Sequence, residues 1–292
     1  MKALPHIPLE NTITPPGIKY PSISAKFIDD LTMATVVKLK DNLEKVDNLE
    51  RPLNYHSRTS HILPDDKNPM ITQLENISEF SALNEMKINK DKTKIMIFNR
   101  SRAFDFQPEL YIDNNLLSVV EDTKLLGVII SSDLKWSKHV KYVKDKCQRK
   151  LWMIKRMKEA GCTIDDMREV YIRQMRCLTE IGCPSWNGAL TKGDIAKIES
   201  IQKTTLRIIL GQRYLSYENA LKTLNLTKLE VRRHHISKKF ARKSQKSDKF
   251  TKWFIPAKKQ TKSGNRFVLP ATRTRTYQKS PLMYLTNLLN EN

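Results

Sequence analysis

The chain has 292 residues, 39% of them hydrophobic, and its 52 Lys and Arg against 31 Asp and Glu give a net charge of +21. The length allows one large domain or two ordinary ones, and the lack of any 18-residue apolar run excludes a membrane-spanning helix. A positive charge of this size favours a polyanionic partner, either nucleic acid or an anionic membrane surface.

The predicted elements begin with an extended lead-in at residues 1–22, which contain five prolines and show no periodicity. Two β-forming runs follow, Ser24–Ile28 and Leu31–Val37, and predict a hairpin with Asp29 and Asp30 at its turn. Neighbouring carboxylates repel each other, and a divalent cation such as Mg²⁺ removes that repulsion. The turn is therefore a candidate metal site; a solvated acidic loop is the alternative that the residues leave open.

A helix is predicted to start at Pro69, after the capping residue Asn68, with its apolar side chains three or four positions apart. Strands with short connections follow, and Asp113-Asn114-Asn115 is predicted to form the turn of a hairpin. The expected strands are Lys94–Phe98, Leu110–Ile112, Leu116–Val120 and Leu125–Ile130. This order predicts an α+β module in which helices cover one side of antiparallel strands.

From Trp136 onward the apolar spacing changes to that of helices. The first of these helices is expected to stop at Gly161, because glycine commonly follows the end of a helix. Thr163 and Thr191 each precede an Asp by three residues, which resembles a capping box and predicts two further helices. Those two are expected to end at Pro184 and Gly211, and later helices to start at Ser216, Thr227 and Ser280.

The positive charge is concentrated near the C-terminus, because Lys228–Lys279 contains 17 Lys and Arg and two acids. In its predicted helix, the apolar side chains Leu229, Ile236 and Phe240 are expected to face inward and the cations outward. Lys246–Thr276 is expected to be disordered when unbound. The aromatic side chains of this tail could stack on unpaired bases or dock the tail on the helical core: Trp253, Phe254, Phe267 and Tyr277.

Three motifs occur in a recognisable order. Phe27-Ile28-Asp29-Asp30 is an aromatic-x-Asp-Asp turn, and residues 84–94 read NEMKINKDKTK. Leu125-Leu126-Gly127 is then followed by Asp133-Leu134-Lys135-Trp136 and by His139. In this order the three resemble motif C, motif D and the segment between palm and thumb in reverse transcriptases of jockey-like non-LTR retrotransposons. The resemblance is dense over residues 20–215 and looser from there to Asn292.

The resemblance implies a fold. It implies part of a polymerase palm, made of antiparallel strands with packed helices, followed by an all-α thumb and a helical C-terminal extension. The α+β pattern of the sequence agrees with this. The expected divisions are an extended lead-in, a partial palm, a thumb and a basic extension with a disordered stretch, at residues 1–22, 23–132, 133–215 and 216–292.

The resemblance also implies RNA-directed DNA polymerisation with Mg²⁺ as cofactor. Asp29 would be a catalytic metal ligand and Asp30 its metal-binding neighbour, while Lys92 would steer or protonate the departing pyrophosphate; a solvated turn lysine is the alternative for Lys92. Two Mg²⁺ ions need a further carboxylate, from motif A, and Glu10 is the only acid before Asp29. We therefore expect a truncated, inactive reverse transcriptase. An incomplete gene model of an active enzyme and a co-opted basic nucleic-acid-binding protein are the alternatives.

The implied partners are RNA and DNA as primer–template, without a membrane, and the oligomeric state is left open. A thumb holds its duplex through Lys and Arg side chains that reach phosphates, and a solvated charged helix face is the alternative. The candidate contacts are Lys138, Lys141, Lys144, Arg149, Lys150, Arg232, Arg233, Lys238, Lys239, Arg242 and Lys243.

The cysteines give information about the compartment. Cys147, Cys162, Cys177 and Cys183 are scattered without any C-x-x-C pair, which predicts neither a zinc site nor a disulfide framework. The N-terminus also lacks the apolar segment of a secretory signal. Both features predict an intracellular protein, in the nucleus or the cytoplasm.

Overall fold

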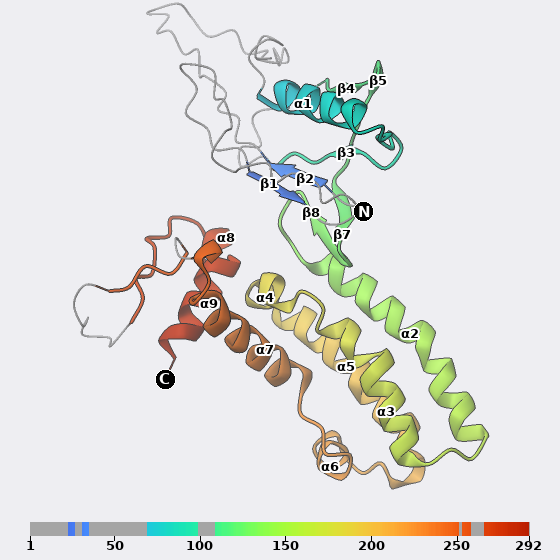
Figure 1. The fold of residues 1–292 in the computed structure, drawn as a ribbon. Coiled ribbons are helices and arrows are strands. Elements are labelled where there is room, and N and C mark those ends of the chain that lie inside the picture. The colour runs from blue at the N-terminus through green and yellow to red at the C-terminus, as the bar shows by residue number, and fades with distance from the viewer. Residues whose placement is uncertain are drawn as a thin grey trace, which may run out of the picture. The chain divides into compact units, whose positions relative to one another are not determined.

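The computed structural model describes residues 23–26, 31–34, 69–98, 109–250, 253–257 and 266–291. They form many helices and a few short strands, which confirms the coarse expectation of an α+β protein (Figure 1). The chain divides into two compact units, Met1–Val120 and Glu121–Asn292. The expected palm region, residues 23–132, therefore extends past the boundary between the two units.

The first unit begins with the predicted hairpin. Strands β1 (Ile23–Lys26) and β2 (Leu31–Ala34) pair in an antiparallel ladder, with Lys26 opposite Leu31. This pairing confirms that a strand precedes and a strand follows Asp29 and Asp30 in the sequence. Asp29 and Asp30 themselves lie outside the described residues.

Helix α1 (Pro69–Leu83) starts at the predicted proline and buries Leu74. Leu74 packs with Leu110, Ile112 and Leu117, which lie on and beside a second hairpin of β4 (Tyr111–Ile112) and β5 (Asn115–Leu116). The two residues between these strands, Asp113 and Asn114, have φ of 46° and 62°. A two-residue hairpin of this type requires positive φ at both positions, and Asp and Asn tolerate it. The predicted hairpin is confirmed, with a turn one residue shorter because Asn115 belongs to the strand.

One predicted strand pairing was wrong. The strand expected at Lys94–Phe98 is limited to β3 (Lys94–Ile95), and it pairs with β6 (Ser118–Val119) in parallel rather than antiparallel fashion. β3 and β6 lie before and after the β4–β5 hairpin in the sequence. Their pairing therefore depends on long-range packing, which the local alternation of apolar and polar residues does not predict.

The second unit opens with a hairpin where we expected one strand. β7 (Asp122–Leu125) and β8 (Val128–Ser131) are antiparallel, and the turn between them has φ of 48° at Leu126 and 86° at Gly127. The predicted strand Leu125–Ile130 was therefore wrong. Glycine adopts this left-handed conformation without steric penalty, which makes Gly127 the residue that permits the turn inside an apolar run.

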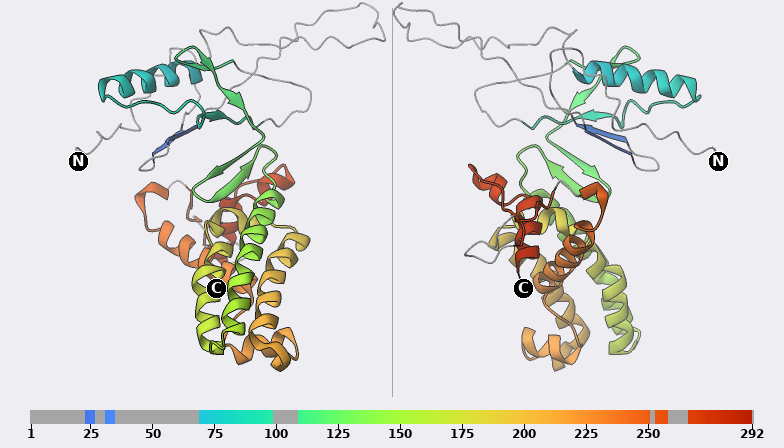
Figure 2. Two further views of the ribbon diagram at one scale, coloured as in Figure 1. Left: turned by 90° about the vertical axis from the view of Figure 1, so that its right-hand side faces the viewer. Right: turned by 60° about the vertical axis from the view of Figure 1, so that its left-hand side comes forward.

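Three helices form the main core of this unit: α2 (Ser137–Glu159), α3 (Ile164–Gln174) and α5 (Lys192–Leu210). They lie side by side in both views of Figure 2, and buried side chains such as Cys147, Tyr171 and Leu206 fill the space between them. The side chains of Thr163 and Thr191 accept hydrogen bonds from the backbone N–H of Asp166 and Asp194, which confirms both predicted capping motifs.

The segment between α3 and α5 is more broken than the sequence predicted. It contains two 3₁₀ turns, η2 (Arg176–Thr179) and η3 (Asn187–Ala189), and the short helix α4 (Cys183–Trp186). Pro184 lies in the first turn of α4, so our expectation that it ends the preceding helix was wrong. Proline fits the first turn because the N–H that it lacks has no partner there.

The remaining helices and 3₁₀ turns complete the second unit. They are η4 (Gly211–Arg213), α6 (Tyr217–Thr223), α7 (Leu229–Ser244), η5 (Asp248–Phe250), α8 (Arg275–Gln278) and α9 (Pro281–Asn290). Ser216 and Ser280 cap α6 and α9 as predicted. In the described ranges, every helix is too short or too polar to cross a bilayer.

Part of the tail that we expected to be disordered is packed. Phe254 is buried with Ala241 of α7 and Leu285 and Leu288 of α9, and Phe267 packs against the same cluster. An isolated antiparallel bridge joins Pro256 to Phe267. Of the two roles proposed for the tail aromatics, docking on the helical core is therefore the one that Phe254 and Phe267 take.

Candidate nucleic-acid interface

The residues expected to perform catalysis are only partly described. Asp29 and Asp30 lie outside the described residues. Lys92 lies in an exposed turn, where its backbone N–H donates to the Asn89 side chain at 3.1 Å. Among the described residues, no group of three or more His, Cys, Asp or Glu side chains could hold a metal ion.

The segment around Asp133 to His139 has a clear structural role, which is to join the β7–β8 hairpin to α2. His139 is buried, and its Nδ1 accepts a hydrogen bond from the backbone N–H of Ile129 at 3.2 Å. Burial lowers the pKa of His139 to about 4, so its ring is neutral at pH 7. Asp133 accepts the backbone N–H of Lys135 at 2.9 Å, and this hydrogen bond lowers the pKa of the carboxyl group.

The candidate cations of α2 fall into two groups. Lys138 forms an ion pair with Asp122 at 2.7 Å, which raises the pKa of its ammonium group, and Lys150 donates to Gln174 at 3.0 Å. Lys141, Lys144 and Arg149 make no ion pair with any described residue. Lys138, Lys141 and Arg149 are spaced by three and eight residues, which places them along one side of the helix.

Next to this row, two lysines surround a tyrosine. The Nζ atoms of Lys124 on β7 and Lys146 on α2 each lie 5.3 Å from the centroid of the Tyr142 ring. The nearby ammonium groups of Lys146 and then Lys124 lower the pKa of the Tyr142 hydroxyl, which has no hydrogen-bond partner among the described residues. The two ammonium groups suit a phosphate oxygen. Lys124 was missed because the sequence predicted one strand where the hairpin lies.

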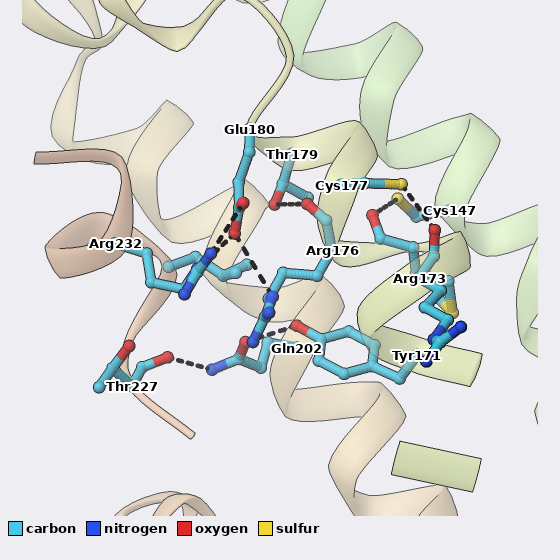
Figure 3. Close-up of polar contacts among 12 residues, drawn as sticks. Cys147, Tyr171, Arg173, Arg176, Cys177, Thr179, Glu180, Gln202, Thr227 and Arg232 are labelled. Carbon is cyan, nitrogen blue, oxygen red and sulfur yellow. Dashed lines mark hydrogen bonds and ion pairs between the residues drawn. The ribbon is translucent and has the colours of Figure 1, made fainter. Parts of the chain in front are cut away.

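Arg232 of α7 is already paired. Its Nε and Nη2 donate to the two carboxylate oxygens of Glu180, at 2.5 and 3.1 Å, and Glu180 also binds Arg176 at 3.4 Å. Figure 3 shows the carboxylate of Glu180 facing both guanidinium groups. The hydrogen bond to Glu180 raises the pKa of Arg232. A bidentate pair of this kind fixes the guanidinium within the protein.

Arg233 is buried, and our expectation that it faces a phosphate at the surface was wrong. Its exposed fraction is 0%, and its Nε donates to the side chain of Asn187 at 2.9 Å. The guanidinium lies 5.7 Å from the Trp186 ring centroid, and neither Nη atom has a hydrogen-bond partner among the described residues. Burial lowers the pKa of Arg233. The inward face of α7 is therefore more polar than predicted, with Arg233, Ser237 and Ser244 on it.

The end of α7 presents the cations that remain available. Lys238 lies 3.8 Å from Glu291, which also binds His234 at 3.2 Å. Lys239, Arg242 and Lys243 are exposed and make no ion pair with a described residue. Of the six α7 residues predicted to bind nucleic acid, these three are the ones without a partner among the described residues.

A buried polar network sets the start of α7. Gln202 of α5 donates to the backbone carbonyl of Thr227 at 2.9 Å and accepts from the hydroxyl of Tyr171 (Figure 3). Glu199, one turn earlier on α5, accepts the backbone N–H of Leu229 at 3.1 Å. The predicted cap Thr227 was therefore wrong, since a carboxylate from another helix caps α7.

No family model matches the chain, and neither a curated protein nor a solved structure matches it. The candidate interface consists of the cations that make no ion pair with a described residue, which are Lys141, Lys144 and Arg149 on α2 and Lys239, Arg242 and Lys243 on α7.

Proposed function

We propose that this chain is the palm-base and thumb part of a non-LTR retrotransposon reverse transcriptase, and that it binds primer–template nucleic acid. The order of the three sequence motifs supports the family. One structural observation carries the binding: Lys141, Lys144 and Arg149 of α2 make no ion pair with a described residue, and the two lysines around Tyr142 lie next to them.

The cations of α2 are suited to the backbone of a duplex. Every phosphate that a lysine or arginine neutralises releases bound counterions, so affinity falls steeply with salt concentration. Lys138 and Lys150 contribute less under this proposal, because each already has a partner in the protein. The proposed duplex contact therefore consists of Lys141, Lys144 and Arg149, with Lys124, Tyr142 and Lys146 on its flank.

The catalytic part of the proposal concerns Asp29, Asp30 and Lys92. Nucleotide transfer would use Mg²⁺ at Asp29 and Asp30, and two-ion geometry needs a third carboxylate, which the resemblance assigns to motif A. We expect primer–template binding without primer extension unless such a carboxylate is supplied. Primer extension with Mg²⁺ tests this, with Asp29→Ala as the control. Nucleotide incorporation that Asp29→Ala abolishes would instead support a complete active site.

Duplex binding is tested with an RNA–DNA duplex and charge-matched variants. The triple variant Lys141→Gln, Lys144→Gln, Arg149→Gln should weaken binding by about tenfold or more and reduce its salt dependence. The control variant removes three exposed cations from other elements, Lys192→Gln, Arg213→Gln and Lys222→Gln, and should change binding little. Equal losses in the two variants, or no binding by the unmodified chain, would contradict the proposal.

A further inference from the structure

Three aromatic rings form a cluster at the C-terminal end of α7. Phe240 contacts Phe250 with ring centroids 6.2 Å apart, and Phe250 contacts Trp253 at 5.1 Å, both in edge-to-face geometry. Phe240 was expected to face the core. Instead its exposed fraction is 37%, and that of Trp253 is 42%. Two rings of the cluster are thus accessible to a ligand.

The rings are held in place from beneath. Phe250 packs against the buried cluster of Ala241, Phe254 and Leu285. The backbone N–H of Trp253 donates to the carbonyl of Phe250 at 2.9 Å, so the two residues that carry these rings are also joined through their backbones. Phe240 and Trp253 are therefore supported by a partly buried ring and do not depend on a ligand for their position.

The neighbouring charges are positive. Lys239 and Lys243 flank Phe240 on α7, and Lys243 is three residues along, on the same side of the helix. Lys246 follows in the turn after the helix and is also exposed. These three lysines make no ion pair with a described residue. Asp248 is the acidic residue of this segment, and it already makes an interaction within the protein.

We propose that Phe240, Phe250 and Trp253, with Lys239, Lys243 and Lys246, bind an unpaired stretch of RNA or DNA. Bases stack on the exposed rings, and the ammonium groups bind the phosphates on either side. The inference rests on the proposed function and extends it, because it assigns the unpaired strand to α7 and η5 and the duplex to α2.

Two other ligands fit this surface less well. The bases of a duplex are stacked on one another, so they offer no free face to an aromatic ring. A membrane-surface helix needs a continuous apolar face for insertion. In α7 the side that carries Leu229, Arg233 and Ala241 is buried within the protein, and the exposed ring of Phe240 lies near the end of the helix.

The test compares one double variant with a matched control on two ligands. The ligands are a labelled single strand of about 12 nucleotides and the RNA–DNA duplex. The variant Phe240→Ala, Trp253→Ala should lose about tenfold in affinity for the single strand and keep its affinity for the duplex. The control Trp152→Ala removes a more exposed tryptophan, at 65%, on α2. It should leave the affinity for the single strand unchanged.

A second variant separates stacking from folding. Phe240→Leu, Trp253→Leu keeps apolar side chains in the cluster and removes the aromatic faces, so it should retain the melting temperature and still lose single-strand affinity. The unmodified chain should also show quenched tryptophan fluorescence on binding the single strand, and less quenching in Trp253→Leu.

The outcomes distinguish the two proposals. If both aromatic variants bind the duplex and the single strand as well as the unmodified chain does, this inference is overturned and the proposed function is not. Failure of the unmodified chain to bind either ligand would overturn the proposed function as well. Binding to vesicles of anionic lipid that the aromatic variants abolish, with single-strand affinity unchanged, would assign the cluster to a membrane surface and overturn the inference.

Discussion

Helices α2 and α7 are both strongly basic, yet they use their cations differently. In α2, Lys141, Lys144 and Arg149 have no ion pair with a described residue. In α7, Arg232 is held by Glu180 and Arg233 is buried against Trp186. Lys138 and Lys150 of α2 also have partners, but at the surface, whereas Arg233 of α7 is fully buried. Charge counted along the chain is therefore different from charge available to a ligand.

The largest expected effect concerns the buried cation of α7. Arg233→Glu should lower the free energy of unfolding by about 3 to 5 kcal/mol, because it places a carboxylate in a buried site without a partner. Arg233→Met removes the charge and keeps the length of the side chain, so the fold and duplex affinity should both persist. Urea unfolding and duplex binding measure these effects. A loss of duplex affinity in a folded Arg233→Met protein would show that the charge reaches the ligand.

The next effect concerns the carboxylate that binds two arginines. Glu180→Gln should lower the free energy of unfolding by about 1 to 3 kcal/mol, since Arg232 and Arg176 lose a charged acceptor. Glu169→Gln is the control, because Glu169 also contacts two arginines but is more exposed. Its effect should be below about 1 kcal/mol. Equal effects of the two substitutions in thermal or urea unfolding would contradict this view of Glu180.

A smaller effect is the pH dependence from His139. Its pKa is about 4 in the folded chain and about 6.5 when unfolded, so the unfolded chain binds more protons between these values. The His139 contribution is complete above about pH 6.5 and is lost as the pH falls toward 4, by up to about 1.4 kcal/mol per pH unit. Urea unfolding across this range measures it. His139→Gln should reduce the slope, and an unchanged slope would refute the assignment.

Local signals predicted much of the second unit. Thr163 and Thr191 cap their helices because a side chain and an N–H three residues later suffice to form the contact. The turn at Leu126-Gly127 was missed because its apolar residues favoured a continuous strand. A glycine within that run was the available signal.

The candidate interface was less predictable, because the decisive partners are distant in sequence. Arg232 pairs with a residue 52 positions away, and Arg233 with one 46 positions away. Periodicity assigns charged residues to the outer face, and it gives no sign that an asparagine and a tryptophan from η3 and α4 accommodate a guanidinium. That Lys141 and Arg149 lie on one side of α2 was predictable, because it depends on helix spacing alone. That Lys138 and Lys150 have partners was not predictable in this way.

The most direct test compares free and engaged cations within the set that the sequence predicted. One variant changes Lys141, Lys144 and Arg149 to Gln, and the other changes Lys138, Lys150 and Lys238 to Gln, so the net charge is altered equally. The measurement is the slope of the logarithm of duplex affinity against the logarithm of salt concentration. The free set should reduce the slope by roughly 2 to 3 and the engaged set by less than about 1. Equal reductions would contradict the claim that the fold selects which cations bind.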